Sequence, residues 1–436
     1  MYFGQRDTYL GGVGFSRDVI CVKHSTSVTA FCGYAYSMNP SNQIKPFVKA
    51  HSRNQKAPVI AQILPSLVRG GVERGTLEMA QAVIDAGGRA IVVSEGGPMV
   101  RHLQRIGAEH YVLPVGSKNP FSWPGTRGRL RRILEAERVD LVHVRSRMPA
   151  TIALPAAKAI NIPSVSTVHG RFQAHNFMKR RFNAKLLAAD HVIAISHYVK
   201  SQIEREFGNM DDRLSVIQRG VDISMFDPTA VPQARIVRFV DSIALPEDQP
   251  VIMLPARATS WKGHDVLLQA LAKISDRQFQ CVLLGAADGK RAFTEHLTSL
   301  GIKLGLEGRF RLTPSVDDMP AALMAADIVV MPSTTPEPFG RVALEAQAMG
   351  RLAVAFDHGG AAESIISGKT GWLARAVDVD SLADCLAEAL AFSAKSRQQM
   401  ATATRAHIEA RFSVAQMCGS TLKVYRHLLK ARYKGT

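Results

Sequence analysis

Two acidic and two basic side chains in the second half of the chain have the types and spacing needed to hold a phosphorylated sugar. Glu337 lies in a proline-flanked segment, and Glu345 follows after seven intervening residues, among Val, Ala, Leu and Met. Arg257 and Lys262 lie close together after an apolar run. Carboxylates accept hydrogen bonds from hydroxyl groups, and Arg and Lys neutralise phosphates. These residues predict a site for a sugar that carries a diphosphate.

Each of these signals also has a simpler structural interpretation. Arg257 and Lys262 are equally compatible with a solvated surface loop, and a lone Glu345 is compatible with an exposed position on its helix, which we expect to begin near Gly340 and end by Gly350. A Glu345 side chain buried among apolar residues would need a partner, because an unpaired carboxylate in an apolar site is costly.

The first half of the chain carries two further candidates. Gly70 and Gly71 stand between an apolar run and a helical pattern, where a backbone without side chains can approach an anion at a helix N-terminus. The alternative is a tight turn. His169 follows another apolar run, as a site residue or as a strand-end histidine bonded to backbone. Neither half opens with G-x-G-x-x-G, which argues against an NAD-dependent Rossmann enzyme.

From residue 59 onward, short apolar runs alternate with helical patterns, which indicates parallel sheets with helices on both faces. The runs begin at residues 59, 90, 110, 139, 164, 191 and 214, and then at residues 251, 279, 310, 327, 352 and 371. Ligands of such sheets bind at the carboxyl ends of the strands, where the candidate residues lie. We predict an α/β fold with two tandem Rossmann-like, doubly wound domains that face one another across a cleft.

The same patterns predict the domain boundaries. Residues 1–56 have no sustained period and are predicted to be a poorly ordered leader, with translation starting at Met38. The predicted parts that follow are an N-terminal acceptor domain over 57–225, a linker over 226–248 broken by three prolines, a C-terminal donor domain over 249–411, and a C-terminal helix over 412–436 that packs across the domains.

Composition limits the class of protein and its partners. The 436 residues are 46% hydrophobic and 21% charged, which suits two globular domains. The net charge is +17, and residues 1–230 carry 30 basic and 17 acidic side chains. This excess favours an anionic partner, and the absence of a nucleic-acid-binding motif favours the cytoplasmic face of a membrane over nucleic acid. A solvated basic surface is the alternative.

Cysteine and metal motifs are absent or explained otherwise. The five cysteines form no C-x-x-C pair, which argues against zinc and a disulfide framework and suits a reducing cytoplasm. No apolar run is long enough to span a bilayer, so membrane contact would be peripheral. Asp378-Val-Asp380 resembles a D-x-D metal motif, but it precedes an amphipathic helix, so we predict that it caps this helix and that no metal is required.

Taken in order, these motifs resemble those of the retaining GT-B glycosyltransferases of family 4, over residues 59 to about 429. The resemblance implies that Glu337 of the E-x7-E motif faces the transferred sugar and that Glu345 faces the ribose. It implies that Arg257 and Lys262 grip the diphosphate. His169, in Thr-Val-His-Gly, would lie beside the transferred sugar.

The resemblance also assigns supporting positions. Gly70 and Gly71 would close over the donor phosphates and the acceptor. The other implied donor contacts are Val316, Phe339, Gly340 and, beneath the nucleotide, His358, Gly359, Gly360 and Glu363. Two residues depart from the family pattern: Arg219 takes an asparagine position, and Arg341 replaces an apolar residue. Both add cations, and whether they select a charged donor or acceptor stays open.

The sequence therefore predicts a cytoplasmic hexosyltransferase without cofactor. It would use a nucleotide diphosphate sugar, with UDP favoured over GDP or ADP, and would act with retention on a lipid-linked or saccharide acceptor in lipopolysaccharide core or cell-surface polysaccharide biosynthesis. The alternatives are a non-catalytic sugar-nucleotide-binding subunit and a GT-B sugar-nucleotide epimerase or hydrolase. The basic stretch 179–187 predicts docking to anionic lipid, with a solvated helix face as the alternative.

Overall fold

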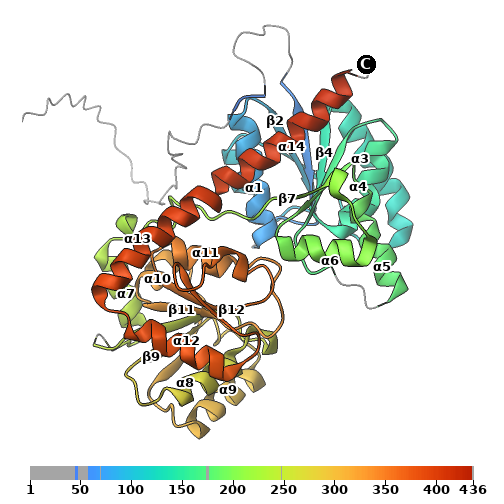
Figure 1. Ribbon diagram of the computed structural model, residues 1–436. Helices are drawn as coiled ribbons and strands as arrows, with labels where there is room; N and C mark the ends of the chain where they lie inside the picture. Colours follow the sequence, from blue (N-terminus) through green and yellow to red (C-terminus); the bar gives the residue numbers. More distant parts are fainter. Residues whose placement is uncertain (1–44, 48–56, 69, 173–175, 247, 435–436) are drawn as a thin grey trace, which may run out of the picture. The chain divides into compact units, whose positions relative to one another are not determined.

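The computed structural model describes residues 45–47, 57–68, 70–172, 176–246 and 248–434, and all of them belong to one compact unit, Met38–Thr436. Most of the predicted leader, including Met38, lies outside the described residues. Strands and helices alternate along the described chain, as the apolar runs predicted (Figure 1).

The first sheet has seven parallel strands in the order β3-β2-β1-β4-β5-β6-β7. Every apolar run of the first set forms one of them. The buried central strands are rich in Val, Ile and Ala, as expected for a parallel sheet that is covered on both faces. The strands are β1 (Val59–Ile63), β2 (Arg89–Ser94), β3 (Glu109–Val112), β4 (Leu141–Val144), β5 (Ser164–Val168), β6 (His191–Ala194) and β7 (Leu214–Val216).

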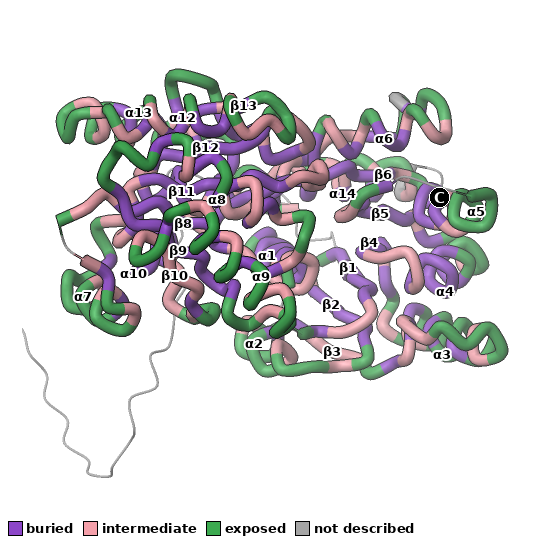
Figure 2. Tube along the Cα trace, turned by 90° about the horizontal axis from the view of Figure 1, so that it is seen from below, coloured by how far each residue is buried: buried purple, intermediate pink, exposed green. Residues whose placement is uncertain are grey.

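Helices connect these strands. Those of the first domain are α1 (Gly71–Asp85), α2 (Val100–Arg105), α3 (Trp123–Ala136), α4 (Arg147–Lys158), α5 (Phe177–Ala184) and α6 (His197–Phe207), with short 3₁₀ turns η1 (Pro120–Ser122), η2 (Leu186–Ala188) and η3 (Asp211–Arg213). In Figure 2 the central strands β1, β4 and β5 are buried, the edge strand β3 is partly exposed, and α3 and α5 present exposed residues. This is the layered arrangement that the sequence predicted.

The second sheet has six parallel strands in the order β10-β9-β8-β11-β12-β13. Its strands are β8 (Val251–Pro255), β9 (Gln280–Leu284), β10 (Phe310–Thr313), β11 (Ile328–Met331), β12 (Leu352–Phe356) and β13 (Gly371–Ala374). Its connecting helices are α8 (His264–Lys273), α9 (Arg291–Lys303), α10 (Met319–Met324), α11 (Arg341–Ala348) and α12 (Val379–Ala391), with the turns η5 (Ser260–Lys262) and η6 (Ala362–Ser364). The predicted pair of Rossmann-like sheets is confirmed.

The segment predicted as a linker contains regular structure. It holds η4 (Pro228–Ala230) and a ten-residue helix, α7 (Gln233–Ser242). Helix α7 packs against α10, and Arg235 donates hydrogen bonds to the carboxylate of Asp318 at the start of that helix. The prolines on both sides led to the prediction of a linker, although the residues between them form a short helix that buries Phe239.

Two C-terminal helices follow α12, namely α13 (Ala394–Arg411) and α14 (Val414–Lys434). Helix α13 packs against α11, and α14 contacts α1 of the first domain, beside which it runs in Figure 1. At the junction, Val221 N donates to Phe412 O, and Val414 N donates to Val221 O. Tyr425 of α14 is fully buried, with its hydroxyl 2.5 Å from His143 Nδ1. The C-terminal helix thus returns to the first domain.

Across the residues that the structure describes, no helix combines the length and the apolar composition that a bilayer crossing requires.

Candidate active site

Glu337 and Lys262 meet beside the second sheet. Lys262 Nζ lies 2.8 Å from Glu337 Oε1, and the Ser333 hydroxyl donates to the same oxygen at 2.5 Å. The side chains of Lys262 and Glu337 are only 20% and 14% exposed. A pair shielded in this way is weakly screened by salt, so it holds both charges in a fixed place. The structure therefore joins the two predicted residues, which are 75 positions apart.

The loop after β8 places Lys262 at the end of that strand. Gly263 follows it with φ of 75°, and a Cβ on this residue would lie 1.8 Å from Pro332 O. A side chain would be both strained and blocked there, so the turn requires glycine. Lys262 Nζ also lies 4.4 Å from the Trp261 ring centre, within cation–π range. Arg257, five residues earlier, is exposed at the carboxyl end of β8.

Glu345 lies on α11, and Arg341 Nη2 lies 2.9 Å from its Oε1. The predicted helix bounds, near Gly340 and Gly350, are confirmed by α11. Burial raises the pKa of Glu345, while the Arg341 guanidinium lowers it. The sequence predicted that a buried Glu345 would need a partner, and the structure supplies Arg341, one helical turn away.

Gly340 precedes α11 in the left-handed region, with φ of 82°, and a Cβ there would lie 2.6 Å from that of Ala361. Phe339 is buried beside it, and Val316, in the loop after β10, is half-buried against the core. The loop at His358 supports the Glu337 segment, because Gly360 N donates to Glu337 O at 2.8 Å. His358 Nε2 lies 2.7 Å from Ser333 O.

Arg219 joins the glycine loop of the first domain to the end of β7. It is buried, and it donates a hydrogen bond from Nη2 to Gly71 O. A Cβ on Gly75, one turn into α1, would lie 2.2 Å from Arg219 Nη1, so the guanidinium occupies the space that a side chain would fill. Burial lowers the pKa of Arg219 to about 10, which leaves it charged at neutral pH.

His169 follows β5 and lines a small buried cavity of about 20 Å³ with His143, Arg145 and Arg219. Its Nε2 atom is buried and has no hydrogen-bond partner among the described residues. Burial and the two neighbouring guanidinium groups lower the pKa of His169 well below its usual value. A neutral imidazole can donate or accept one hydrogen bond at each nitrogen, which suits a sugar hydroxyl. The Nε2 atom therefore makes no bond to backbone within the described residues, and the site role of His169 stays a prediction.

The carboxyl-end loops of the two sheets approach one another. Arg341, beside Glu345, lies against Gly71: a Cβ on that glycine would be 3.7 Å from both Cδ and Nη1 of Arg341. The charge on Arg74, in the first turn of α1, contributes to lowering the pKa of Glu345. The predicted residues Gly70, Gly71 and Glu345 thus belong to one region, although their roles toward a ligand stay predictions.

The Glu363 side chain, which belongs to the second domain, forms its hydrogen bonds with residues of the first domain. Its carboxylate accepts hydrogen bonds from His197 N and Tyr198 N at the start of α6, at 3.1 and 2.8 Å, and from Gln218 Nε2 at 2.6 Å. An acidic side chain at a helix N-terminus satisfies unpaired N–H groups and suits the helix dipole. The structure gives Glu363 this helix-capping position, which the resemblance did not predict.

The D-x-D sequence is a helix cap, as predicted. Asp378 accepts a hydrogen bond from Ser381 N at 2.9 Å, and α12 begins at the next residue. Asp380 pairs with Lys273 at 2.7 Å. Within the described ranges, His, Cys, Asp and Glu side chains form no cluster of three or more that could hold a metal ion.

Three residues were missed by the sequence analysis. Ser333, Gly75 and Arg145 all contact or surround the candidate site. Arg145 is buried and donates to Gln62 Oε1 at 2.7 Å. The signal that could have indicated Arg145 is its place directly after β4, at the same edge as His169.

Comparisons with known proteins agree with this geometry. Residues 69–225 match the model of Glycosyltransferase Family 4, and residues 238–407 match that of Glycosyl transferases group 1. A glycosyltransferase structure from Rickettsia africae is 31% identical, with a TM-score of 0.80 over 86% of this chain and 100% of that one. The D-inositol 3-phosphate glycosyltransferase of Xylanimonas cellulosilytica is 29% identical over 67% of this chain and 73% of its own.

A third comparison concerns the fold alone. Anabaena HepE, whose crystal structure contains UDP and glucose, is 23% identical, with a TM-score of 0.72 over 84% of this chain and 99% of that one. The regions that the two family models match include β2 to β7, all strands of the second sheet, and the positions of Glu337, Glu345, Lys262 and His169. The chain belongs to the group 1, family 4 glycosyltransferases and has the GT-B fold.

Proposed function

We propose that this glycosyltransferase moves a hexose-type sugar, with retention, from a nucleotide diphosphate donor to a lipid-linked or saccharide acceptor. We place the reaction in lipopolysaccharide core or cell-surface polysaccharide biosynthesis, at the cytoplasmic face of a membrane. The observation that carries the donor part of this proposal is the shielded Lys262–Glu337 pair at the end of a parallel sheet. It offers a cation for a diphosphate next to a carboxylate for sugar hydroxyls.

The reaction breaks the bond between the anomeric carbon and the diphosphate oxygen and forms a bond from that carbon to the acceptor oxygen. The acceptor hydroxyl proton passes to the departing diphosphate. Arg257, Lys262 and the N-terminus of α11 would stabilise the negative charge that grows on the leaving group. We propose that these groups do so without a metal ion and without a cofactor.

The remaining residues would orient the sugar. Glu337 would accept hydrogen bonds from sugar hydroxyls, and Glu345, beside Arg341, from the ribose. The neutral His169, whose Nε2 atom is buried, would bond the transferred sugar from the first domain. Gly70, Gly71 and Gly340 would let backbone approach the donor, with Val316 and Phe339 beside the nucleotide. UDP is the favoured base, in line with the UDP and glucose in the crystal structure of HepE.

A phosphorylated cyclitol is a second acceptor class. The curated relative from Xylanimonas cellulosilytica is named a D-inositol 3-phosphate glycosyltransferase. In this chain, Arg219 and Arg341 depart from the family pattern, and both lie against the glycine loop. Guanidinium groups in this region suit an acceptor that carries a phosphate.

A donor and acceptor screen tests these proposals. Thermal shift and calorimetry would be run with UDP, GDP and ADP and their sugars, first without metal and then with Mg²⁺. Stabilisation by one nucleotide without metal, lost in Glu345→Ala, is the expected result. Product analysis by NMR would show whether the anomeric configuration is retained. Turnover of the donor without an acceptor would favour the epimerase or hydrolase, and the absence of any nucleotide effect would favour a non-catalytic subunit.

A further inference from the structure

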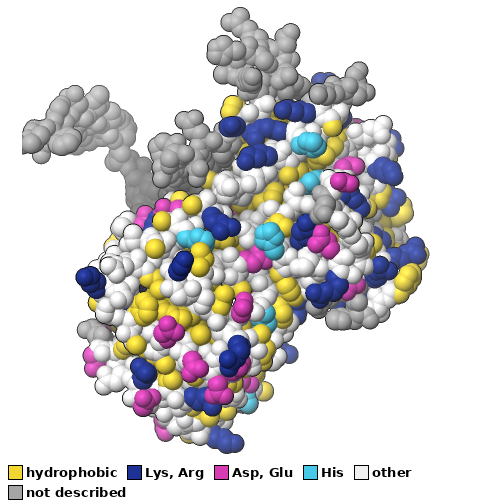
Figure 3. All heavy atoms as spheres, viewed as in Figure 1, with side chains coloured by type: hydrophobic (Ala, Val, Ile, Leu, Met, Phe, Trp, Pro, Cys, Tyr) yellow, Lys and Arg dark blue, Asp and Glu magenta, His cyan; other side chains and the backbone are white. Residues whose placement is uncertain are grey.

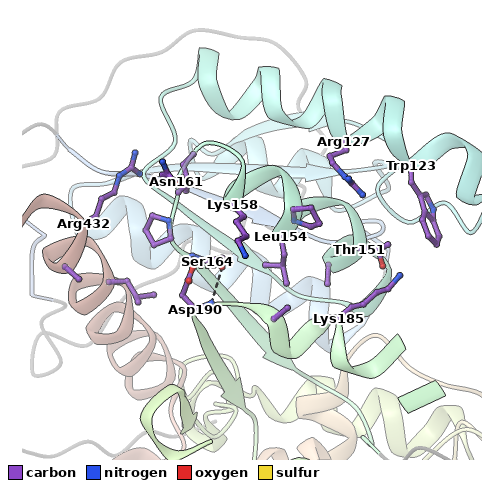
Figure 4. A pocket seen from close by; sticks show the side chains of 17 residues that line it. Trp123, Arg127, Thr151, Leu154, Lys158, Asn161, Ser164, Lys185, Asp190 and Arg432 are labelled. Carbon is purple, nitrogen blue, oxygen red and sulfur yellow. Dashed lines mark hydrogen bonds between the residues drawn. The ribbon is translucent and has the colours of Figure 1, made fainter. Parts of the chain in front are cut away.

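An open groove of about 930 Å³ lies on the first domain, away from the candidate active site (Figure 4). Residues that lead into β5 and β6, including Pro163 and Asp190, line it, so it lies at the amino ends of these strands. His169 lies at the opposite end of β5, a strand length of about 16 Å away. None of the groove residues belongs to the predicted donor site.

About half of the residues that line the groove are aliphatic. Leu154 and Pro155 of α4 line the groove, as does Ile162. Leu428 and Ala431 of α14 also line it. Arg432 holds α14 in place here, because its Nη1 donates to Asp140 O at 2.8 Å. The groove is therefore built by packed helices and can accept an apolar chain.

Cations line this apolar groove. Arg127, Lys158, Lys185 and Arg432 contribute to its walls, against a single acid, Asp190. The Asp190 carboxylate already accepts hydrogen bonds from Ser164 N and Oγ, both at 2.8 Å. In Figure 4, Arg432 lies at one end of the groove, Lys158 near the middle, and Arg127 and Lys185 at the other end with Trp123.

Trp123 brings two of these cations together. Lys185 Nζ lies 5.1 Å from the centre of its ring, and Arg127 follows one turn later on the same face of α3. Among the residues that the structure describes, neither cation forms an ion pair with a carboxylate. This end of the groove therefore suits the phosphate of a ligand whose apolar part lies against α4.

The surroundings of this end favour a lipid over a soluble anion. Phe121, just before Trp123, is 91% exposed, and Phe177 and Met178 at the start of α5 are 69% and 73% exposed. Exposed aromatic and apolar side chains next to cations are typical of surfaces that enter a membrane interface. On the face in Figure 3, Lys and Arg side chains also gather over α14.

The structure changes which residues of the basic stretch can reach a membrane. Leu186 and Leu187, which gave the stretch its amphipathic pattern, are buried in the core. Helix α5 ends at Ala184, and its exposed apolar residues are Phe177 and Met178 at its beginning. The exposed apolar residues thus lie just before the basic stretch.

We propose that this groove binds an anionic phospholipid, with its phosphate between Arg127 and Lys185 and its acyl chain against Leu154 and Pro155. Phe121, Phe177 and Met178 would enter the interface beside it. This inference deepens the membrane contact proposed above and does not depend on the transfer chemistry. It gives the first domain a lipid site separate from the donor and acceptor.

Vesicle binding by the full chain tests the proposal. Wild type would be sedimented with vesicles of phosphatidylcholine, with and without phosphatidylglycerol. The double variant Arg127→Gln/Lys185→Gln is expected to bind the anionic vesicles about 30-fold more weakly, from roughly 1 kcal/mol per cation. The matched double variant Lys290→Gln/Lys303→Gln removes two exposed lysines of the second domain and is expected to bind like wild type.

A second variant separates the groove from general surface charge. Pro155→Trp keeps every cation and fills the groove from an exposed position on α4. Weaker binding of this variant supports the groove, whereas wild-type binding overturns it and leaves surface charge alone. Dihexanoyl phosphatidylglycerol should bind saturably in calorimetry; equal binding of glycerol 3-phosphate would overturn the lipid assignment. Nucleotide-induced thermal shifts, measured on every variant, report folding and the donor site independently.

Discussion

Replacing Lys262 with methionine tests the part of the site on which the proposed chemistry most depends. Lys262 Nζ lies 2.8 Å from Glu337 Oε1, and both side chains are largely shielded from water. A cation held in this way needs little rearrangement when charge develops on a diphosphate oxygen. Loss of one such preorganised group costs about 3 kcal/mol of transition-state stabilisation, or about 10²–10³ in kcat. Lys262→Met is therefore expected to lower kcat by this factor.

The same change should weaken the fold only slightly. Glu337 loses a charged hydrogen bond but keeps the bond from the Ser333 hydroxyl, so a loss of about 1–2 kcal/mol in the free energy of unfolding is expected. Steady-state kinetics with the donor identified by the screen would measure kcat and KM, and urea unfolding would measure stability. The methionine side chain has a similar length, which limits packing changes.

Lys273→Met is the matched control. Lys273 pairs with Asp380 at 2.7 Å, but these side chains are 50% and 70% exposed, and neither is a candidate site residue. Its removal should leave kcat and KM unchanged. The reasoning is refuted if Lys262→Met raises the donor KM while kcat stays at the wild-type value, because the lysine would then contribute equally to ground-state and transition-state binding.

Three further predictions follow from the site. Gly75→Ala should lower stability by about 1–3 kcal/mol and weaken donor binding, because its methyl group displaces Arg219; unchanged calorimetric affinity would contradict this. Burial raises the pKa of Glu345, so the protonated side chain stabilises the folded state. This stabilisation is fully present below about pH 4.5 and is lost as the pH rises through the higher pKa of the folded state. Measurements of unfolding across this range should show the loss in wild type and not in Glu345→Gln. The lowered pKa of His169 keeps it neutral, so kcat should not fall between pH 7 and 6 through its protonation; a loss of activity in this range that His169→Asn abolishes would count against it.

Local patterns predicted the sheets because each strand is a continuous apolar run bounded by turn residues. The bounds of α11 and the Asp378 cap were also predictable, since both depend on residues within a few positions of one another. Helix α7 was missed because prolines surround only ten helical residues, and its stability comes from packing against α10. For α7, the sequence pattern within the helix was therefore less informative than its packing against α10.

The partners within the site could not be predicted in this way. Arg219 and Gly71 are 148 positions apart, and Glu363 and Tyr198 are 165 apart. Such contacts depend on how the loops of the two sheets pack against one another. A short stretch of sequence carries no information about this packing. The family resemblance supplied candidate roles, but it did not indicate that Glu363 accepts hydrogen bonds from the start of α6.

The two glutamates of the E-x7-E motif have different environments, and this difference argues for different tasks. Glu337 precedes α11, in a loop fixed by Gly360, and its carboxylate receives Lys262 and the Ser333 hydroxyl on one oxygen. Among the described residues, both of these bonds end on Oε1, so Oε2 is the oxygen that we expect to accept a sugar hydroxyl. Glu345 lies inside the helix, and its carboxylate is paired with Arg341, which favours the charged form. Replacing Arg341 should therefore impair Glu345 first, through nucleotide affinity, whereas replacing Lys262 should impair Glu337 and the leaving group together, through kcat.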